Sequence, residues 1–336
     1  MSKRKLTKQQ LSRIKENQDK LLSKARDKKT DPSSEEFDTE HLPGIIVSQY
    51  GVTLDVEDTN GNIIKCHARQ NLGPIVCGDK VYWNMGQDEK GLVTTLMPRQ
   101  SLLTRSGYHG NLKPVAANID QIIIVCARKP LYREELIDKY LVAAENLGIT
   151  PVIAFNKADM LNEKQTNEIK VMLANYSAIG YQAVMVSATV THGLDDLLSV
   201  MNNKTSILAG QSGVGKSTII NYLLPDENVP VGELSDSKDK GKHTTTASRL
   251  YHLPHGGKLI DSPGVRDFGL HNVGADEIIH GFIEFRPFIG RCKFKNCAHL
   301  KDAGCALQAA VLNGQISQRR LDSYQHIIEQ LTSTSE

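Results

Sequence analysis

The sequence of 336 residues has few cysteines, no long apolar run and almost no net charge. Six cysteines are too few for a disulfide framework in a chain of this length, so we expect a reducing, intracellular setting. No run of about 18 apolar residues occurs, which argues against a membrane-spanning helix. The basic start MSKRKLTKQQ lacks the apolar stretch of a secretory signal, and we therefore expect a cytoplasmic protein with no membrane partner.

The net charge of +2 indicates nothing about an acidic partner, but its distribution is uneven. Residues 1–30 contain eleven Lys or Arg and three acidic residues, a local charge of +8. We interpret residues 1–40 as a basic flexible arm that binds RNA phosphates, with a solvated disordered tail as the alternative.

The length and an ordinary content of 40% hydrophobic residues predict two or three globular domains behind this arm. Between residues 44 and 105, short alternating apolar stretches are broken by turn residues such as Asn60-Gly61, which indicates a small antiparallel barrel or sandwich. We predict boundaries of 41–112 for this β domain, 113–273 for an α/β domain and 274–336 for a mostly helical domain.

The α/β prediction rests on four apolar runs, each followed by an amphipathic segment. Strands that are apolar throughout and alternate with helices imply a parallel sheet covered on both faces. The predicted strands are 122–127, 151–156, 183–188 and 206–210, and the predicted helices are 134–147, 162–175, 194–201 and 216–224.

A phosphate-binding loop is predicted between the last of these strands and its helix. The segment GQSGVGKS fits the pattern G-x-x-x-x-G-K-[ST], in which glycines let successive N–H groups converge on an anion. Lys216 would reach the β and γ phosphates, and the Ser217 hydroxyl would bind Mg²⁺. An accidental glycine turn is the alternative, and the strand-to-helix context argues against it. The predicted phosphate site contains Gly210, Gln211, Ser212, Gly213, Val214, Gly215, Lys216, Ser217 and Thr218.

The base bound with the phosphates is predicted by Asn156-Lys157-Ala158-Asp159, which follows the strand 151–156. The Asp159 carboxylate can accept two hydrogen bonds from N1–H and the amine of guanine, whereas adenine offers an acceptor at N1. Ser187-Ala188, at the end of the next strand, would support the guanine. A helix cap is the alternative for the first motif alone.

The segment Asp261-Ser262-Pro263-Gly264 fits D-x-x-G, in which Asp261 holds the Mg²⁺ shell and the N–H of Gly264 meets the γ phosphate. Upstream, Thr244, Thr245 and Thr246 are candidate switch threonines that could ligate Mg²⁺. The residues alone leave the choice among the three open.

The order of these motifs differs from that of ordinary GTPases, in which the phosphate loop comes first. Here the guanine motif and Ser-Ala precede the phosphate loop, and the switch segment and D-x-x-G follow it. We interpret this order as a circular permutation of a P-loop GTPase domain. The switch segment then runs directly into the C-terminal domain, so we expect the γ-phosphate state to be passed there mechanically.

A zinc site is predicted in that C-terminal domain. Cys292-x4-Cys297-x-His299-x5-Cys305 offers the Cys₃His set of a closed, structural zinc site. Buried cysteines without a ligand are the alternative, which we expect instead for Cys66, Cys77 and Cys126. Basic and aromatic residues around the cluster could meet RNA, with a solvated basic face as the alternative. They are Arg286, Arg291, Lys293, Lys295, Lys301, Phe285, Phe288 and Phe294.

The barrel-like start, GQSGVGKST, HTTT, DSPGVRDFG and the Cys/His cluster together resemble the ribosome small subunit-dependent GTPase A family over about residues 40–330. The resemblance implies an OB-fold and a cytoplasmic GTPase that is stimulated by the small (30S) ribosomal subunit, binds its 16S-type rRNA and assists its late maturation. It also favours Thr245 as the Mg²⁺ ligand and His243 as a catalytic residue.

The residue after D-x-x-G is Val265, where many GTPases carry the Gln that orients the attacking water. Hydrolysis without a partner should therefore be slow, and His243 or the partner must supply the polar contact. A solvated loop residue is the alternative role of His243. A GTP-gated RNA-binding protein with incidental hydrolysis, or an assembly GTPase acting on another RNA particle, are the alternative functions. No heptad pattern occurs, and we expect a monomer.

Overall fold

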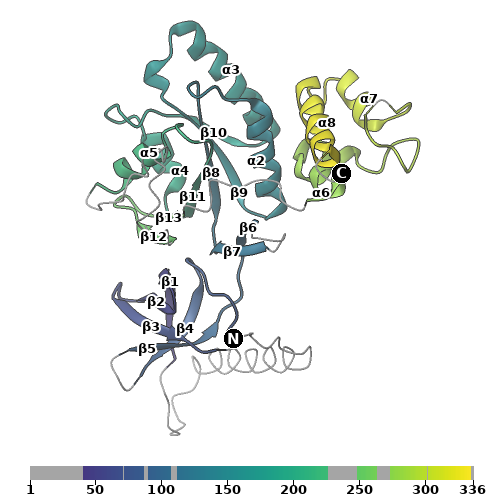
Figure 1. Cartoon of the computed structure of the whole chain (residues 1–336). Coiled ribbons are helices and arrows are strands. Elements are labelled where there is room, and N and C mark those ends of the chain that lie inside the picture. The colour runs from purple at the N-terminus through teal and green to yellow at the C-terminus, as the bar shows by residue number, and fades with distance from the viewer. Residues whose placement is uncertain are drawn as a thin grey trace, which may run out of the picture.

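The structure is a computed structural model that describes residues 41–70, 72–86, 90–106, 112–225, 248–262, 273–300 and 302–333. A β-barrel, an α/β part with a central sheet and a helical C-terminal region follow one another along the chain (Figure 1). The predicted basic arm, 1–40, lies outside the described residues.

The N-terminal strands close into a five-stranded barrel. Its strand β1 pairs with both β2 and β4, β2 pairs with β3, and β5 closes the ring between β3 and β4. The inner face holds Ile46, Val56 and Trp83, each at most 2% exposed. The barrel predicted from the sequence, in its OB-fold form, is therefore confirmed over the alternative of a sandwich. The strands are β1 (Leu42–Tyr50), β2 (Thr53–Asp58), β3 (Ile63–Ala68), β4 (Lys80–Met85) and β5 (Gly91–Leu96).

A short ribbon leads from the barrel to the α/β part. Strands β6 (Leu102–Ser106) and β7 (Leu112–Ala117) pair with each other in a separate two-stranded sheet. The barrel packs directly on the end of β7, because the Asn118 side chain donates to the Gly78 carbonyl at 2.9 Å. A Cβ atom on Gly78, whose φ is +87°, would lie 2.2 Å from the Ala117 oxygen. This seam therefore requires glycine at position 78.

The central sheet has the order β10-β9-β8-β11-β13-β12, parallel except for β12. The edge strand β12 also meets the barrel strand β1 through the pair Ser48 and Arg249, so one sheet runs through both parts. The parallel α/β sheet predicted from the four apolar runs is confirmed. The strands are β8 (Gln121–Ala127), β9 (Thr150–Asn156), β10 (Gln182–Met185), β11 (Thr205–Ala209), β12 (Arg249–His252) and β13 (Lys258–Asp261).

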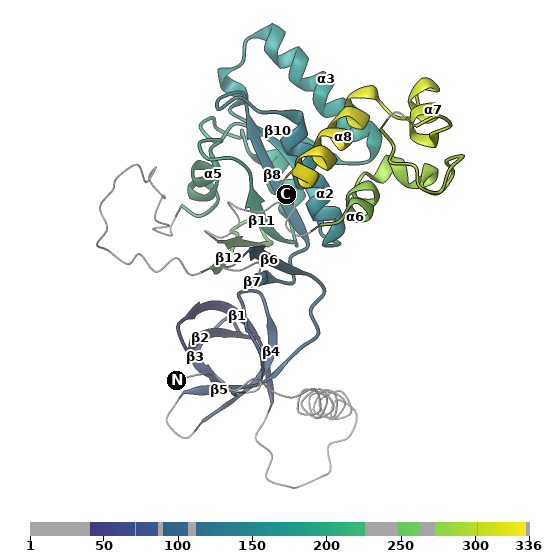
Figure 2. The ribbon, with the colours of Figure 1, turned by 45° about the vertical axis from the view of Figure 1, so that its right-hand side comes forward.

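Helices cover both faces of this sheet because alternate residues of the central strand β8 enter different cores. Ile122 and Ile124 pack with helices α2 (Glu134–Asn146) and α3 (Glu163–Ile179). Their neighbours Ile123 and Val125 pack on the other face. The helices of that face are α4 (Asp195–Met201) and α5 (Lys216–Leu223). The α2 and α3 layer lies between the sheet and the C-terminal region (Figure 2).

The C-terminal region is helical and packs on α2. Val142 of α2 lies in the same apolar core as Phe282, Phe285 and Tyr324. Among the described residues, no helix is long and apolar enough to cross a bilayer. The elements are α6 (Ala275–Gly281), a 3₁₀ helix (Ile283–Phe288), α7 (Ala306–Leu312) and α8 (Gln318–Ser333).

Candidate nucleotide and metal sites

The predicted phosphate loop connects the carboxyl end of β11 to the start of α5, at the edge of the sheet where ligands bind in such folds. Two of its glycines have positive φ and no space for a side chain. A Cβ on Gly210 (φ +139°) would lie 2.2 Å from the Val125 oxygen, and one on Gly215 (φ +100°) would lie 2.3 Å from Asn156 Nδ2. The loop therefore needs these glycines to pass close to β8 and β9.

Asn156, the last residue of β9, holds three loops together. Its Nδ2 donates to the Val214 carbonyl at 3.0 Å, and its Oδ1 accepts from the Ala188 amide at 3.3 Å. The side chain is buried, so both bonds are shielded from water. The phosphate loop, the guanine motif and the Ser-Ala pair, which are far apart in the sequence, consequently form one site.

Lys157 strengthens the same connection. Its backbone is left-handed (φ 61°), and its Nζ donates to the carbonyl oxygens of Gly213 at 2.6 Å and Lys129 at 2.9 Å. The turn Ala158–Met160 that follows has no side-chain cap. The helix-cap alternative for this motif is therefore not what the structure shows, since Asn162 caps the next helix.

Asp159 lies at the exposed end of the site, where its carboxylate is accessible to a ligand. The Ser187 hydroxyl donates to its Oδ1, and the Thr189 hydroxyl donates to its Oδ2 at 3.4 Å. These contacts orient the carboxylate that the sequence predicts as the guanine acceptor. Thr189 was not among the predicted residues, although its place directly after Ser187-Ala188 was the available signal.

Lys216 lies over the phosphate loop. Its Nζ donates to the carbonyl oxygens of Gly210 at 2.7 Å and Gln211 at 2.6 Å. Ser217 and Thr218 follow in the first turn of α5, and Gln211, Ser212 and Gly213 are exposed along the loop. The nine consecutive residues 210–218 that are predicted to bind phosphate thus belong to one loop and helix start, whereas the tenth, Gly264, lies outside the described residues.

Asp261 ends β13, which pairs with β11, and the two strands end at the same edge of the sheet. The next residue, Ser262, is buried and accepts a hydrogen bond from the Ser248 hydroxyl at 2.7 Å. Six residues that the sequence singles out in the switch segment and in D-x-x-G lie outside the described residues. They are His243, Thr244, Thr245, Thr246, Gly264 and Val265.

The four predicted zinc ligands converge. Their ligand atoms all lie within 4.8 Å of one another. His299 Nδ1 lies 3.5 Å from the Sγ atoms of Cys292 and Cys305 and 3.6 Å from that of Cys297. A tetrahedral zinc ion with Zn–S of about 2.3 Å and Zn–N of about 2.1 Å requires N···S separations of about 3.6 Å. The cluster therefore has the dimensions and the donor set of a zinc site, with Nδ1 as the imidazole ligand.

The protonation of the cluster fits the same chemistry. Burial lowers the pKa of His299, which keeps its imidazole neutral and able to donate a lone pair. Burial and the thiols of Cys292 and Cys305 raise the pKa of Cys297 to about 12. A cation bound among the sulfur atoms would replace thiol protons, so its binding depends on pH. Cys66, Cys77 and Cys126 are buried apart from this cluster, as predicted.

The aromatic and basic residues around the cluster are not all on the surface. Phe294 is 51% exposed, with the Lys293 ammonium 5.5 Å from its ring centre. Phe285 is fully buried in the C-terminal core, so the prediction that it meets RNA bases is wrong. Arg286 is engaged with Glu145 of α2 at 2.7 Å. Arg291 and Lys295 are exposed, and Lys301 lies outside the described residues.

Comparisons with known proteins agree with this arrangement. The model of the RsgA GTPase family matches residues 96–271. The chain is 45% identical over 99% of its length to the "Small ribosomal subunit biogenesis GTPase RsgA" of Haemophilus influenzae, of which it covers 97%. It is 46% identical to the protein of the same name from Chromohalobacter salexigens, covering 99% of this chain and 100% of that protein.

Two solved structures share the whole architecture. YjeQ from Thermotoga maritima is 30% identical, with a TM-score of 0.73 over 87% of this chain and 99% of the other. YloQ, described as a circularly permuted GTPase, is 25% identical, with a TM-score of 0.71 over 90% of this chain and 99% of the other. With its permuted order of guanine motif, phosphate loop and D-x-x-G, the chain belongs to the RsgA GTPase family.

Proposed function

We propose that the chain binds the small (30S) ribosomal subunit and its 16S-type rRNA, assists late maturation of that subunit, and hydrolyses GTP to GDP and phosphate faster when the subunit is bound. The names of relatives that match nearly the full length support this function. The observation that carries the nucleotide part is the contact of Asn156 with both the phosphate loop and Ala188.

Guanine selection is assigned to the motif Asn156 to Asp159 and to Ser187-Ala188. Asp159 accepts the N1–H and exocyclic amine of the base, and the Ser187 hydroxyl keeps its carboxylate in place. Asn156 and Lys157 position this motif against the phosphate loop. The site thus binds both ends of a guanine nucleotide and rejects adenine.

Phosphate binding is assigned to the backbone N–H groups of residues 210–218 and to Lys216. Mg²⁺ would be held by Ser217, Asp261 and Thr245, whose hydroxyl and carboxylate oxygens are the hard donors that this ion prefers. Bound there, Mg²⁺ supplies positive charge next to the phosphate oxygens. One Zn²⁺ on Cys292, Cys297, His299 and Cys305 would have a structural role, because four ligands leave no open position.

Hydrolysis needs a group that orients the attacking water, and Val265 has no polar atom for this task. We assign this role to His243, whose imidazole can accept a hydrogen bond from water. Lys216 and Thr245 complete the proposed catalytic set. The subunit would stimulate turnover by positioning His243 next to the attacking water. We propose that the protein acts as a monomer in the cytoplasm, where it meets free subunits.

GTP turnover by the purified protein tests the proposal when it is measured alone and then with small subunits, large subunits or transfer RNA, with ATP as a control. We expect a large rise with small subunits only, its loss in Lys216→Ala and its reduction in His243→Ala. Hydrolysis that no RNA particle stimulates would instead support a GTP-gated binding protein. Stimulation by large subunits or transfer RNA would support an assembly GTPase for another particle.

A further inference from the structure

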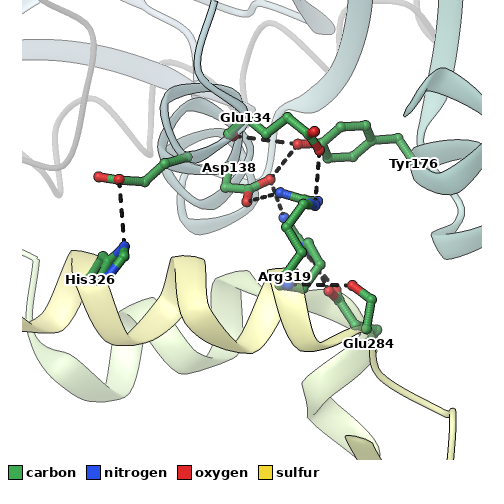
Figure 3. Close-up of polar contacts among 9 residues, drawn as sticks. Glu134, Asp138, Tyr176, Glu284, Arg319 and His326 are labelled. Carbon is green, nitrogen blue, oxygen red and sulfur yellow. Dashed lines mark hydrogen bonds and ion pairs between the residues drawn. The ribbon is translucent and has the colours of Figure 1, made fainter. Parts of the chain in front are cut away.

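A cluster of charged side chains joins the α/β part to the C-terminal region. Glu134 and Asp138 project from α2, and Arg319 reaches them from α8 across the gap between the two ribbons (Figure 3). The name ion cluster is used below for five residues, which are Glu134, Asp138, Glu284, Arg319 and Arg320. Two of these residues come from α2 and three from the C-terminal region, so the cluster lies at the interface between the two parts.

Arg320 is the centre of the ion cluster. Its Nη1 lies 2.6 Å from Asp138 Oδ1, while Nε and Nη2 lie 2.5 Å and 3.1 Å from the two carboxylate oxygens of Glu284. The side chains of Arg320 and Asp138 are both fully buried. One guanidinium thus bridges a carboxylate of α2 and a carboxylate of the 3₁₀ helix, which its planar fork of donors allows.

Aromatic rings and further hydrogen bonds enclose this bridge. The Tyr176 hydroxyl donates to Asp138 Oδ1 at 2.7 Å, and Arg319 Nη1 donates to Oδ2 at 2.8 Å. The Arg320 guanidinium lies 4.3 Å from the ring centre of Phe282. Although burial alone would lower the pKa of Arg320, Asp138 and Glu284 raise it, so the guanidinium stays protonated. Arg320 and Asp138 can form all of these hydrogen bonds only when the α/β part and the C-terminal region are in this one relative position.

The helix that receives this bridge also begins beside the nucleotide site. Residues 128–133 connect β8 to α2, and the Lys129 carbonyl accepts a hydrogen bond from Lys157 Nζ, which also binds the Gly213 carbonyl. Tyr132 packs edge-on against Phe155 with ring centres 5.4 Å apart. The start of α2 is therefore attached to the guanine motif, and through it to the phosphate loop.

We propose that Arg320 is a positioning residue that fixes the C-terminal region on α2, so that this region has a set place relative to the nucleotide site before any partner binds. A fixed region would lose less conformational freedom when a large particle binds. That consequence for subunit binding rests on the proposed function, whereas the fixed position does not.

The fixed position is tested by replacing Arg320 with Lys, which keeps the charge but cannot bridge both carboxylates as the guanidinium does. Dyes introduced through unnatural amino acids at Val171 and Leu312, which are 62% and 88% exposed, would report the distance between α3 and α7 without involving the zinc cysteines. We expect one narrow distance distribution in the parent protein and a broad one in Arg320→Lys, with unchanged zinc content. An equally narrow distribution in Arg320→Lys would overturn the proposal.

Arg286→Lys is the matched control, because Arg286 also contacts α2, through Glu145, but is 48% exposed. We expect this variant to keep the narrow distance distribution, since an exposed ion pair contributes little free energy. Glu284→Gln is a second test in case Arg320→Lys does not fold. It leaves the Asp138 contact intact and should broaden the distribution to a smaller extent.

Kinetics separate a positioning role from a loss of folded protein. In Arg320→Lys we expect the small-subunit concentration for half-maximal stimulation to rise about tenfold, with stimulated kcat at saturation within about twofold of the parent. A loss of folded protein would instead lower kcat at an unchanged half-saturating concentration, which would contradict the proposal. A broadened distribution in a protein that no subunit stimulates would refute the proposed function and leave the positioning role standing.

Discussion

Asn156 and Asp159 belong to one short motif, yet their environments give them different tasks. Asn156 is buried, and both of its side-chain polar atoms form hydrogen bonds within the protein, to the backbone of Val214 and Ala188. Asp159 is exposed, and its carboxylate is oriented by the hydroxyls of Ser187 and Thr189. The first residue therefore builds the site, and the second is available to select the ligand.

Asp159→Asn should exchange the base that the site prefers. The amide oxygen can still accept from N1–H, but the amide NH₂ faces the guanine amine and matches the C2 carbonyl of xanthine instead. We expect GTP affinity to fall about 10- to 100-fold and affinity for xanthosine triphosphate to rise, as measured by fluorescence titration. Asp196→Asn, at an exposed position on α4, should change neither affinity. Unchanged GTP binding in Asp159→Asn would exclude this role.

At the scale of elements, the four predicted zinc ligands lie in a segment with little regular structure. Between the 3₁₀ helix that ends at Phe288 and the start of α7 at Ala306, the described chain has no helix or strand. His299 has a left-handed backbone (φ 62°). The four predicted ligands draw this segment together beside the C-terminal core, where Cys305 is buried, and Gln325 of α8 donates to the carbonyls of His299 and Leu300.

Removal of the metal should therefore loosen this segment first. A strong chelator, or Cys297→Ser, should release about one zinc ion per chain and increase amide exchange between residues 289 and 305 by at least tenfold. Exchange in the barrel strands should not change. Cys77→Ser, a buried cysteine outside the cluster, is the control and should keep its metal. Full metal retention in Cys297→Ser would rule out the proposed ligand set.

Whether a feature could be predicted depends on how far apart in the sequence the residues that form it lie. The phosphate loop, the guanine motif and the proposed zinc ligands are local patterns, so short stretches of the sequence are enough to predict them. The ribbon of β6 and β7 was missed because its short strands do not alternate in polarity. Phe285 was misassigned because only the packing of the C-terminal helices buries it. The bridge of Arg320 to Asp138 joins residues 182 positions apart, which no local pattern indicates.

At the scale of the whole molecule, the two outer parts are attached to different sides of the sheet. The barrel contacts β12 through Ser48 and Arg249, and Glu57 of β2 pairs with His252 at 2.8 Å. The C-terminal region is held on α2, which covers one face of the sheet against the central strand β8. The expected direct connection from the switch segment to the C-terminal region is thus accompanied by a second connection, through α2.

Gly78→Ala should weaken the seam between the barrel and the sheet. The new Cβ would lie 2.2 Å from the Ala117 oxygen and 3.2 Å from Ile260 Cδ1, and the positive φ alone costs about 1–3 kcal/mol. Gly73→Ala is matched in φ (+74°) but has open space, so it carries only the backbone cost. We expect Gly78→Ala to lower the first melting transition several degrees more than Gly73→Ala. Equal shifts would show that the close approach at the seam is not essential.

The permuted strand order also sets the sequence of events during synthesis. Of the central-sheet strands, β8, β9 and β10 leave the ribosome first and can pair with one another, with the guanine motif at the end of β9. Strand β11 then joins the free side of β8, and β13 joins β11 only later. A nascent chain that ends before residue 210 therefore has the residues proposed to select the base but no phosphate loop. The nucleotide can consequently act as a ligand for folding only when most of the chain has been made.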